Sequence, residues 1–172
     1  MNNKLLSILL QSIALVLIQV LVLNNVHYLR VATPFLYLYI LLKLPIQTPI
    51  SRSLLFSFCL GLAVDIFSNT IGMHAAVCTF IGFIRERLIQ LFLDKKIPEG
   101  TKPSFSSLGY GMFIRYTLLI VLIHHSLLFL IESFSLFDSL FLLLRIVASS
   151  LFTCLLIFIV ETFNLQNLKN DK

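Results

Sequence analysis

The run Leu140–Val160, LFLLLRIVASSLFTCLLIFIV, decides the fold class of this chain. It contains one charged residue, Arg145, and neither proline nor glycine. A helix needs about 20 apolar residues to cross the hydrocarbon layer of a bilayer, with a lower limit near 17. The run therefore predicts a transmembrane helix.

The composition of the whole chain has the same character. Of the 172 residues, 58% are hydrophobic and 12% are charged, and the mean hydropathy is +0.96. A soluble domain of this size cannot hide so much apolar surface, because much of its surface faces water. The composition excludes a soluble enzyme, a disordered chain and a secreted disulfide scaffold. It predicts a single integral membrane domain over residues 1–172.

Six continuous apolar runs are candidate transmembrane helices, and they do not alternate as the strands of a barrel would. The runs are Leu5–Leu23, Val31–Leu44, Leu54–Phe67, Ile71–Ile84, Met112–Ile131 and Leu140–Val160. The second, third and fourth are short, so each must extend into flanking polar residues or thin the bilayer. The sequence thus predicts an all-α, polytopic bundle of about six helices.

Two connections between these runs are informative. Only Ser68–Thr70 separates the third run from the fourth, which predicts a tight helical hairpin. The longest connection, Asp94–Gly111, contains Pro98, Gly100 and Pro103 and predicts a flexible loop.

Basic residues indicate the orientation in the membrane, because cytoplasmic loops are rich in lysine and arginine. With a cytoplasmic N-terminus, six crossings leave only Arg30 in the outer loops. The inner side then holds Lys4, Lys43, Arg52, Arg85, Arg87, Lys95, Lys96, Lys102, Lys169 and Lys172. We therefore expect both termini in the cytoplasm. Topology explains the basic residues better than contacts with nucleic acid, so no nucleic-acid partner is expected.

Four ionisable residues within the runs can be sorted by depth. Asp65 and Arg145 fall at one level near the outer face, and Arg115 and Glu161 at one level near the inner face. Because charges in lipid are costly, we expect an outer ion pair Asp65–Arg145 and an inner ion pair Arg115–Glu161. The alternative is that the long side chains reach outward to the headgroups.

His74, His124 and His125 fall on the same side of the membrane as Asp65 and Arg145. His74 and Cys78 are four residues apart and could hold a metal with Asp65, but one helical turn supplies two ligands at most. We therefore expect no metal site. His124 and His125 point to different faces of their helix, so hydrogen-bonded packing is favoured over a proton relay.

No catalytic or cofactor-binding motif is present. The chain lacks Gly-x-Ser-x-Gly, His-Glu-x-x-His and a phosphate-binding loop, so neither a catalytic residue nor a cofactor is expected.

Gly61 and Asp65 share one helix face, where the glycine lets another helix approach closely.

The stretch Gly61–Ala75, GLAVDIFSNTIGMHA, resembles the signature of MreD, the rod shape-determining membrane protein family of bacteria. That signature has a glycine, an aspartate four residues later, and Gly-x-His-Ala opening the next helix, here Gly61, Asp65, Gly72 and His74. The family pattern also fits two further stretches, Pro34–Tyr37 and Leu44-Pro45 with Thr48-Pro49. His124-His125 with Phe129 and Glu132 is similar to the version found in Bacteroidota.

The resemblance implies a non-catalytic subunit of the cell-elongation complex in the bacterial cytoplasmic membrane. Implied partners are a periplasmic scaffold protein of the MreC type, an MreB-type filament, a RodA-type glycosyltransferase and a penicillin-binding transpeptidase. The implied fold is similar to that of the substrate-binding subunits of energy-coupling-factor vitamin transporters.

In that role, small residues such as Gly61, Gly72 and Gly82 would let a partner helix dock. Lys95, Lys96 and Lys102 would meet anionic lipid or an acidic partner, unless they only set the orientation.

Two other functions remain open from the sequence. A vitamin-type transporter subunit would hold a small molecule in an outer pocket lined by Asp65, His74 and Arg145. A lipid-modifying membrane enzyme would need acidic or His-Asp groups that converge at the bilayer surface, and the sequence offers few.

Overall fold

The computed structural model describes residues 2–23, 32–70, 72–92, 97–133 and 138–170. These residues form seven helices and no β-strand, which confirms the all-α class. The helices are α1 (Asn2–Leu21), α2 (Leu38–Leu42), α3 (Ile50–Ser68), α4 (Met73–Leu91), α5 (Phe105–Leu108), α6 (Tyr110–Ser133) and α7 (Ser139–Asn170).

Three of the described helices are long and apolar enough to cross a membrane: α3, α6 and the Ser139–Gln166 part of α7. This agrees with a helical membrane protein. Among the described residues three helices meet this criterion, and not the six that the sequence predicted. Within the second run only the five residues of α2 are helical, and α4 carries charges at residues 85–87 near its end.

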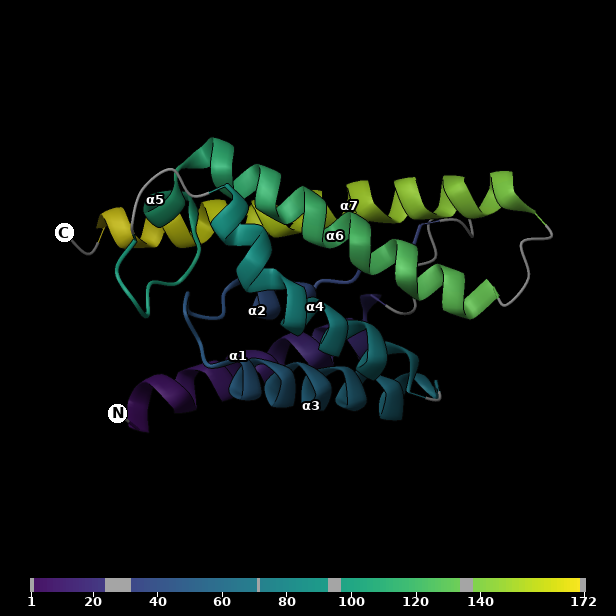
Figure 1. The fold of residues 1–172 in the computed structure, drawn as a ribbon, viewed down its shortest axis with the longest axis horizontal. Coiled ribbons are helices and arrows are strands. Elements are labelled where there is room, and N and C mark those ends of the chain that lie inside the picture. The colour runs from purple at the N-terminus through teal and green to yellow at the C-terminus, as the bar shows by residue number, and fades with distance from the viewer. Residues whose placement is uncertain (1, 24–31, 71, 93–96, 134–137, 171–172) are drawn as a thin grey trace.

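The long helices form two layers with α4 and α2 between them (Figure 1). α1 and α3 lie together in one layer, and α6 and α7 lie together in the other. α4 packs against both α3 and α6 and so connects the layers. The first residues of α1 and the last residues of α7 lie at the same end of the molecule, which also holds α5.

A non-helical segment, Ala32–Tyr37, leads into α2 at the centre of the molecule and is largely buried. Pro34 explains the lack of helix, because proline has no N–H and pushes Thr33 away from helical angles. Backbone of this kind is tolerated at membrane depth only where protein surrounds it and satisfies its polar groups.

Side chains of α1 and α7 supply the partners that this segment needs. Gln19 on α1 bonds to it twice, and two hydroxyl groups of α7 each accept one backbone N–H. The contacts are Gln19 Nε2 to Pro34 O (2.9 Å), Leu36 N–H to Gln19 Oε1 (2.8 Å), Thr33 N–H to Ser149 Oγ (3.0 Å) and Phe35 N–H to Thr153 Oγ1 (3.0 Å). The segment is therefore fixed between the two layers.

The described part of the Asp94–Gly111 connection, which was predicted as a flexible loop, forms backbone hydrogen bonds with the chain that follows α2. Ile46 donates its N–H to Thr101 O at 2.9 Å, and Gly100 donates its N–H to Ile46 O at 3.1 Å. Ser104 caps α5 by accepting from Ser107 N–H. The connection is thus attached to the chain that follows α2. Residues 94–96 lie outside the described part.

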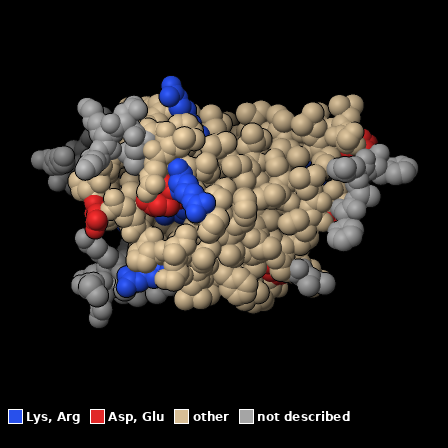
Figure 2. All heavy atoms as spheres, viewed as in Figure 1, with Lys and Arg blue, Asp and Glu red and all other residues tan. Residues whose placement is uncertain are grey.

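The charged side chains are concentrated toward one end of the molecule. Figure 2 shows Lys and Arg gathered toward the end where both termini lie, and a largely uncharged surface over the middle. We call this the basic end; its described members include Lys43, Arg52, Arg87 and Lys102. Its placement in the cytoplasm stays a prediction.

Candidate functional site

Asp65 lies at the junction of α3 and α4 and is 2% exposed. Its Oδ1 accepts the hydroxyl of Thr70 (2.5 Å) and the backbone N–H of His74 (3.1 Å), and lies 3.0 Å from His74 Nδ1. Its Oδ2 accepts the N–H of Ala75 at 2.8 Å. These N–H groups are the unpaired donors of the first turn of α4, and a carboxylate there is also favoured by the helix dipole. Asp65 therefore caps the neighbouring helix.

The turn between the two helices requires unusual backbone angles. Asn69, which follows α3, has φ of 54°, and Gly72, which precedes α4, has φ of 70°. A Cβ at Gly72 would meet no atom within 4 Å, so conformation and not close packing requires the glycine. The predicted tight helical hairpin is confirmed.

Gly61 and Gly82 bring α3 and α4 into direct contact. A Cβ at Gly61 would lie 2.5 Å from the carbonyl oxygen of His74 and 2.6 Å from Cα of Ala75. A Cβ at Gly82 would lie 2.9 Å from Cβ of Ser57. Gly61 therefore does admit another helix, but that helix is α4. The prediction that Gly61, Gly72 and Gly82 receive a partner helix is not supported by these positions.

The predicted outer ion pair between Asp65 and Arg145 is wrong. Arg145 donates to Glu132 on the adjacent α6 at 2.9 Å, and its guanidinium carbon lies 4.2 Å from the ring centre of Phe129. Asp65 instead faces α4. Equal depth did not bring the two charges together, because each has a closer partner on a neighbouring element.

The predicted inner ion pair between Arg115 and Glu161 is wrong as well. Glu161, 2% exposed, accepts from Lys43 Nζ at 3.0 Å, from the hydroxyl of Tyr39 at 2.6 Å and from the N–H of Phe105 at 3.2 Å. Arg115 is exposed, and it forms no ion pair with any residue in the described ranges. Glu161 thus joins α7 to the residues around α2 and α5.

Three histidines surround the ring of Phe35. The ring centres of His74, His124 and His125 lie 5.6, 5.7 and 5.2 Å from that of Phe35. His124 and His125 are completely buried. The two adjacent histidines therefore reach one buried cluster, although they had been expected to serve separate faces.

The hydrogen bonds of these two histidines are distinct. His124 Nε2 lies 2.8 Å from the hydroxyl of Tyr37. His125 Nδ1 lies 2.8 Å from the carbonyl oxygen of Val121, so this nitrogen carries a proton. His125 Nε2 can then accept the hydroxyl of Thr153 at 3.1 Å. Both rings are thus buried and hydrogen-bonded, as the packing interpretation predicts.

The described residues contain no group of three His, Cys, Asp or Glu side chains that could hold a metal ion. Cys78 is buried, and His74, one turn before it, is bonded to Asp65.

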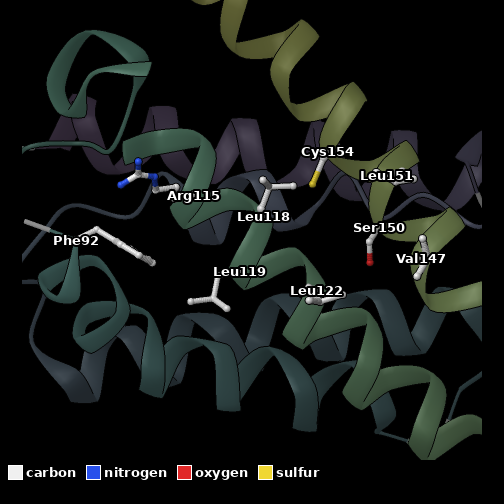
Figure 3. A pocket seen from close by; sticks show the side chains of 9 residues that line it. All are labelled: Phe92, Arg115, Leu118, Leu119, Leu122, Val147, Ser150, Leu151 and Cys154. Atoms are coloured by element: carbon white, nitrogen blue, oxygen red, sulfur yellow. The ribbon is translucent and has the colours of Figure 1, made fainter. Parts of the chain in front are cut away.

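A groove of about 440 Å³ runs between α6 and α7 (Figure 3). Arg115 and Phe92 lie at one end, and leucines such as Leu118, Leu122 and Leu151 form its walls. The hydroxyl of Ser150 faces it and has no hydrogen-bond partner.

Four cavities lined by described residues have volumes of about 350 to 660 Å³, and none of these four is lined by Asp65, His74 or Arg145. None of the four is therefore the outer pocket of Asp65, His74 and Arg145 that the transporter alternative requires.

Sequence reasoning missed several contributors to these buried contacts. Gln19 is an amide in an apolar run, a signal that could have identified it. Tyr39 and Lys43 could not be assigned to Glu161, because more than a hundred residues separate them. Arg85 was expected on the inner surface, but it is 1% exposed and donates to the carbonyl oxygen of Leu44.

No protein-family model, curated protein or solved structure matches this chain. The resemblance to MreD therefore rests on the residues themselves.

Proposed function

We propose that this chain is a non-catalytic membrane subunit of the bacterial cell-elongation complex, of the MreD type. It would scaffold peptidoglycan synthesis through helix–helix contacts with a single-span partner similar to MreC. The observation that carries the proposal is the α3–α4 hairpin, where Gly61, Asp65, Gly72 and His74 each have a structural role. These are the residues on which the resemblance rests.

The buried ionisable groups support a scaffolding role. The carboxylates of Asp65 and Glu161 are both buried and are bonded to donors from other elements. Groups in such contacts hold helices in a fixed order. A rigid bundle of this kind is suited to presenting a helix face to a partner.

We assign the partner helix to the groove between α6 and α7 (Figure 3). Leu118 and Leu122 on α6 are each more than 40% exposed, and so is Leu151 on α7. The adjacent Ala148 and Ser150 are small, which lets a second helix approach closely.

The proposal includes a complete set of membrane crossings. Besides the three long apolar helices, α1, α4 and the Ala32–Ile46 segment would also cross, with both termini in the cytoplasm. The position of the basic end supports this orientation.

A thiol reagent that cannot pass the membrane should label Lys102→Cys only after the cytoplasmic membrane is opened. Labelling in intact cells would refute the orientation.

Depletion of the protein in its source cell tests the function. We expect loss of elongated shape and disturbed insertion of new cell wall, and co-purification of a single-span periplasmic coiled-coil protein. Normal shape with failed uptake of a nutrient would refute the proposal and support the transporter alternative.

Rescue of depleted cells tests the assigned face. Leu151→Trp fills the groove, whereas Leu55→Trp places the same bulk on α3; the two leucines are 63% and 66% exposed. We expect Leu151→Trp to lose rescue and co-purification and Leu55→Trp to keep both. Equal behaviour of the two variants would refute the assignment.

A further inference from the structure

A second cavity lies at the basic end, between α1, α2, α7 and the segment that precedes α5. Its volume is about 540 Å³, and it differs from the α6–α7 groove because lysines and amides line part of it. None of its lining residues belongs to the hairpin around Asp65.

The polar part of this cavity carries an excess of positive charge. Lys43 and Lys102 both line it. Lys43 is bonded to Glu161, whereas the ammonium group of Lys102 is exposed and has no ion pair within the described ranges. Of the two ammonium groups that line the cavity, only that of Lys43 is paired with a carboxylate, so the charge of Lys102 is left to attract an anion. Asn164 adds an amide beside them.

The rest of the lining is apolar. Ile8 and Leu15 of α1 lie on one helix face, opposite Ile40 of α2 and Val160 of α7. On α7, Asn164 lies about 6 Å nearer the basic end than Val160, at the helical rise of about 1.5 Å per residue. The cavity thus combines a polar part with an apolar part, and this combination fits an amphiphile.

We propose that this cavity binds an anionic phospholipid of the cytoplasmic leaflet. Its phosphate would accept hydrogen bonds from Lys102 and Lys43, and one acyl chain would lie along the apolar face of α1. Lysines that line a pocket between helices on the cytoplasmic side are suited to such headgroups. An acidic peptide would satisfy the lysines but not the apolar face. The inference rests on the membrane embedding proposed above.

Brominated lipids test the site, because bromine on the acyl chains quenches nearby tryptophan and the chain has no tryptophan. Ile8→Trp places a reporter at the cavity, and Leu55→Trp places one on the lipid-exposed face of α3. Each variant is placed in vesicles with brominated phosphatidylglycerol or with brominated phosphatidylcholine. At Ile8→Trp we expect about a fivefold preference for the anionic lipid, the usual effect of one lysine. At Leu55→Trp we expect none.

Charge variants in the Ile8→Trp background identify the group responsible. Lys102→Gln should abolish the preference and Lys102→Arg should keep it. Arg52→Gln also removes one positive charge from the basic end, but at a position outside the cavity. It should therefore leave the lipid preference unchanged. A preference that survives Lys102→Gln, or that Arg52→Gln lowers equally, would overturn the proposal.

A second measurement covers the case in which the reporter itself fills the cavity. Native mass spectrometry of the unmodified chain should show retained phosphatidylglycerol that Lys102→Gln loses. Equal retention by the two proteins would overturn the proposal. Failure of both brominated lipids to quench either tryptophan would instead refute the membrane embedding.

Discussion

Replacing Asp65 by asparagine tests whether this residue serves as the cap of α4. The substitution keeps the size of the side chain but removes its charge and one acceptor oxygen. In the structure Oδ1 accepts the N–H of His74 and Oδ2 accepts the N–H of Ala75. The amide group of an asparagine can accept only one of them, so a buried donor would face its NH₂ group.

The expected loss follows from these contacts. A buried donor without a partner costs about 1–3 kcal/mol. Loss of a buried negative charge at a helix N-terminus costs up to about 2 kcal/mol. We therefore expect Asp65→Asn to lower the free energy of unfolding by about 2–4 kcal/mol. For a chain of this length that is a fall in Tm of roughly 5–15 °C.

Thermal unfolding in detergent, followed by circular dichroism, measures this loss. Asp138→Asn is the matched control, because Asp138 is exposed and accepts the N–H of Phe141 at the start of α7. Asparagine and aspartate are about equally good at such an exposed cap, so the control should lose less than about 0.5 kcal/mol. If Asp65→Asn were no less stable than Asp138→Asn, the capping role of Asp65 would be refuted.

Three further substitutions test other contacts by the same unfolding measurement. Gly61→Ala should destabilise the protein by about 1–3 kcal/mol, because its Cβ would overlap the backbone of α4. Gly111→Ala, which has open space around it, should be neutral or slightly stabilising. Equal effects of the two substitutions would contradict the close contact at Gly61. Thr153→Val should cost about 1–3 kcal/mol, because a buried backbone N–H loses its acceptor, and no loss would contradict that bond. Glu132→Arg and Arg145→Glu should each lower the free energy of unfolding, and the double exchange should recover up to about 1 kcal/mol of that loss. Absence of recovery would count against their ion pair.

Local patterns in the sequence predicted the parts of the structure that depend on neighbouring residues. The three-residue separation at Ser68–Thr70 predicted the hairpin, and Gly61 predicted the close helix contact. Both depend on residues within about fifteen positions of each other. The second run was predicted as a transmembrane helix, but only α2 formed, because Pro34 disfavours helix at the start of that run.

The ion pairs could not be predicted in the same way. Depth along a helix follows from residue number, but the direction in which a side chain points depends on how the helices pack around one another. Arg145 and Asp65 share a level and still face different neighbours. Glu161 binds Lys43, which lies 118 residues earlier in the chain, and no local pattern specifies such a partner.

The backbone of Ala32–Tyr37 depends on the first and last helices of the chain. Thr33 and Phe35 donate to Ser149 and Thr153, more than a hundred residues later. During synthesis these N–H groups have no protein acceptor on α7 until the ribosome has made that helix and it has entered the bilayer. A chain that ends before residue 149 therefore lacks the acceptors of two backbone N–H groups at its own centre.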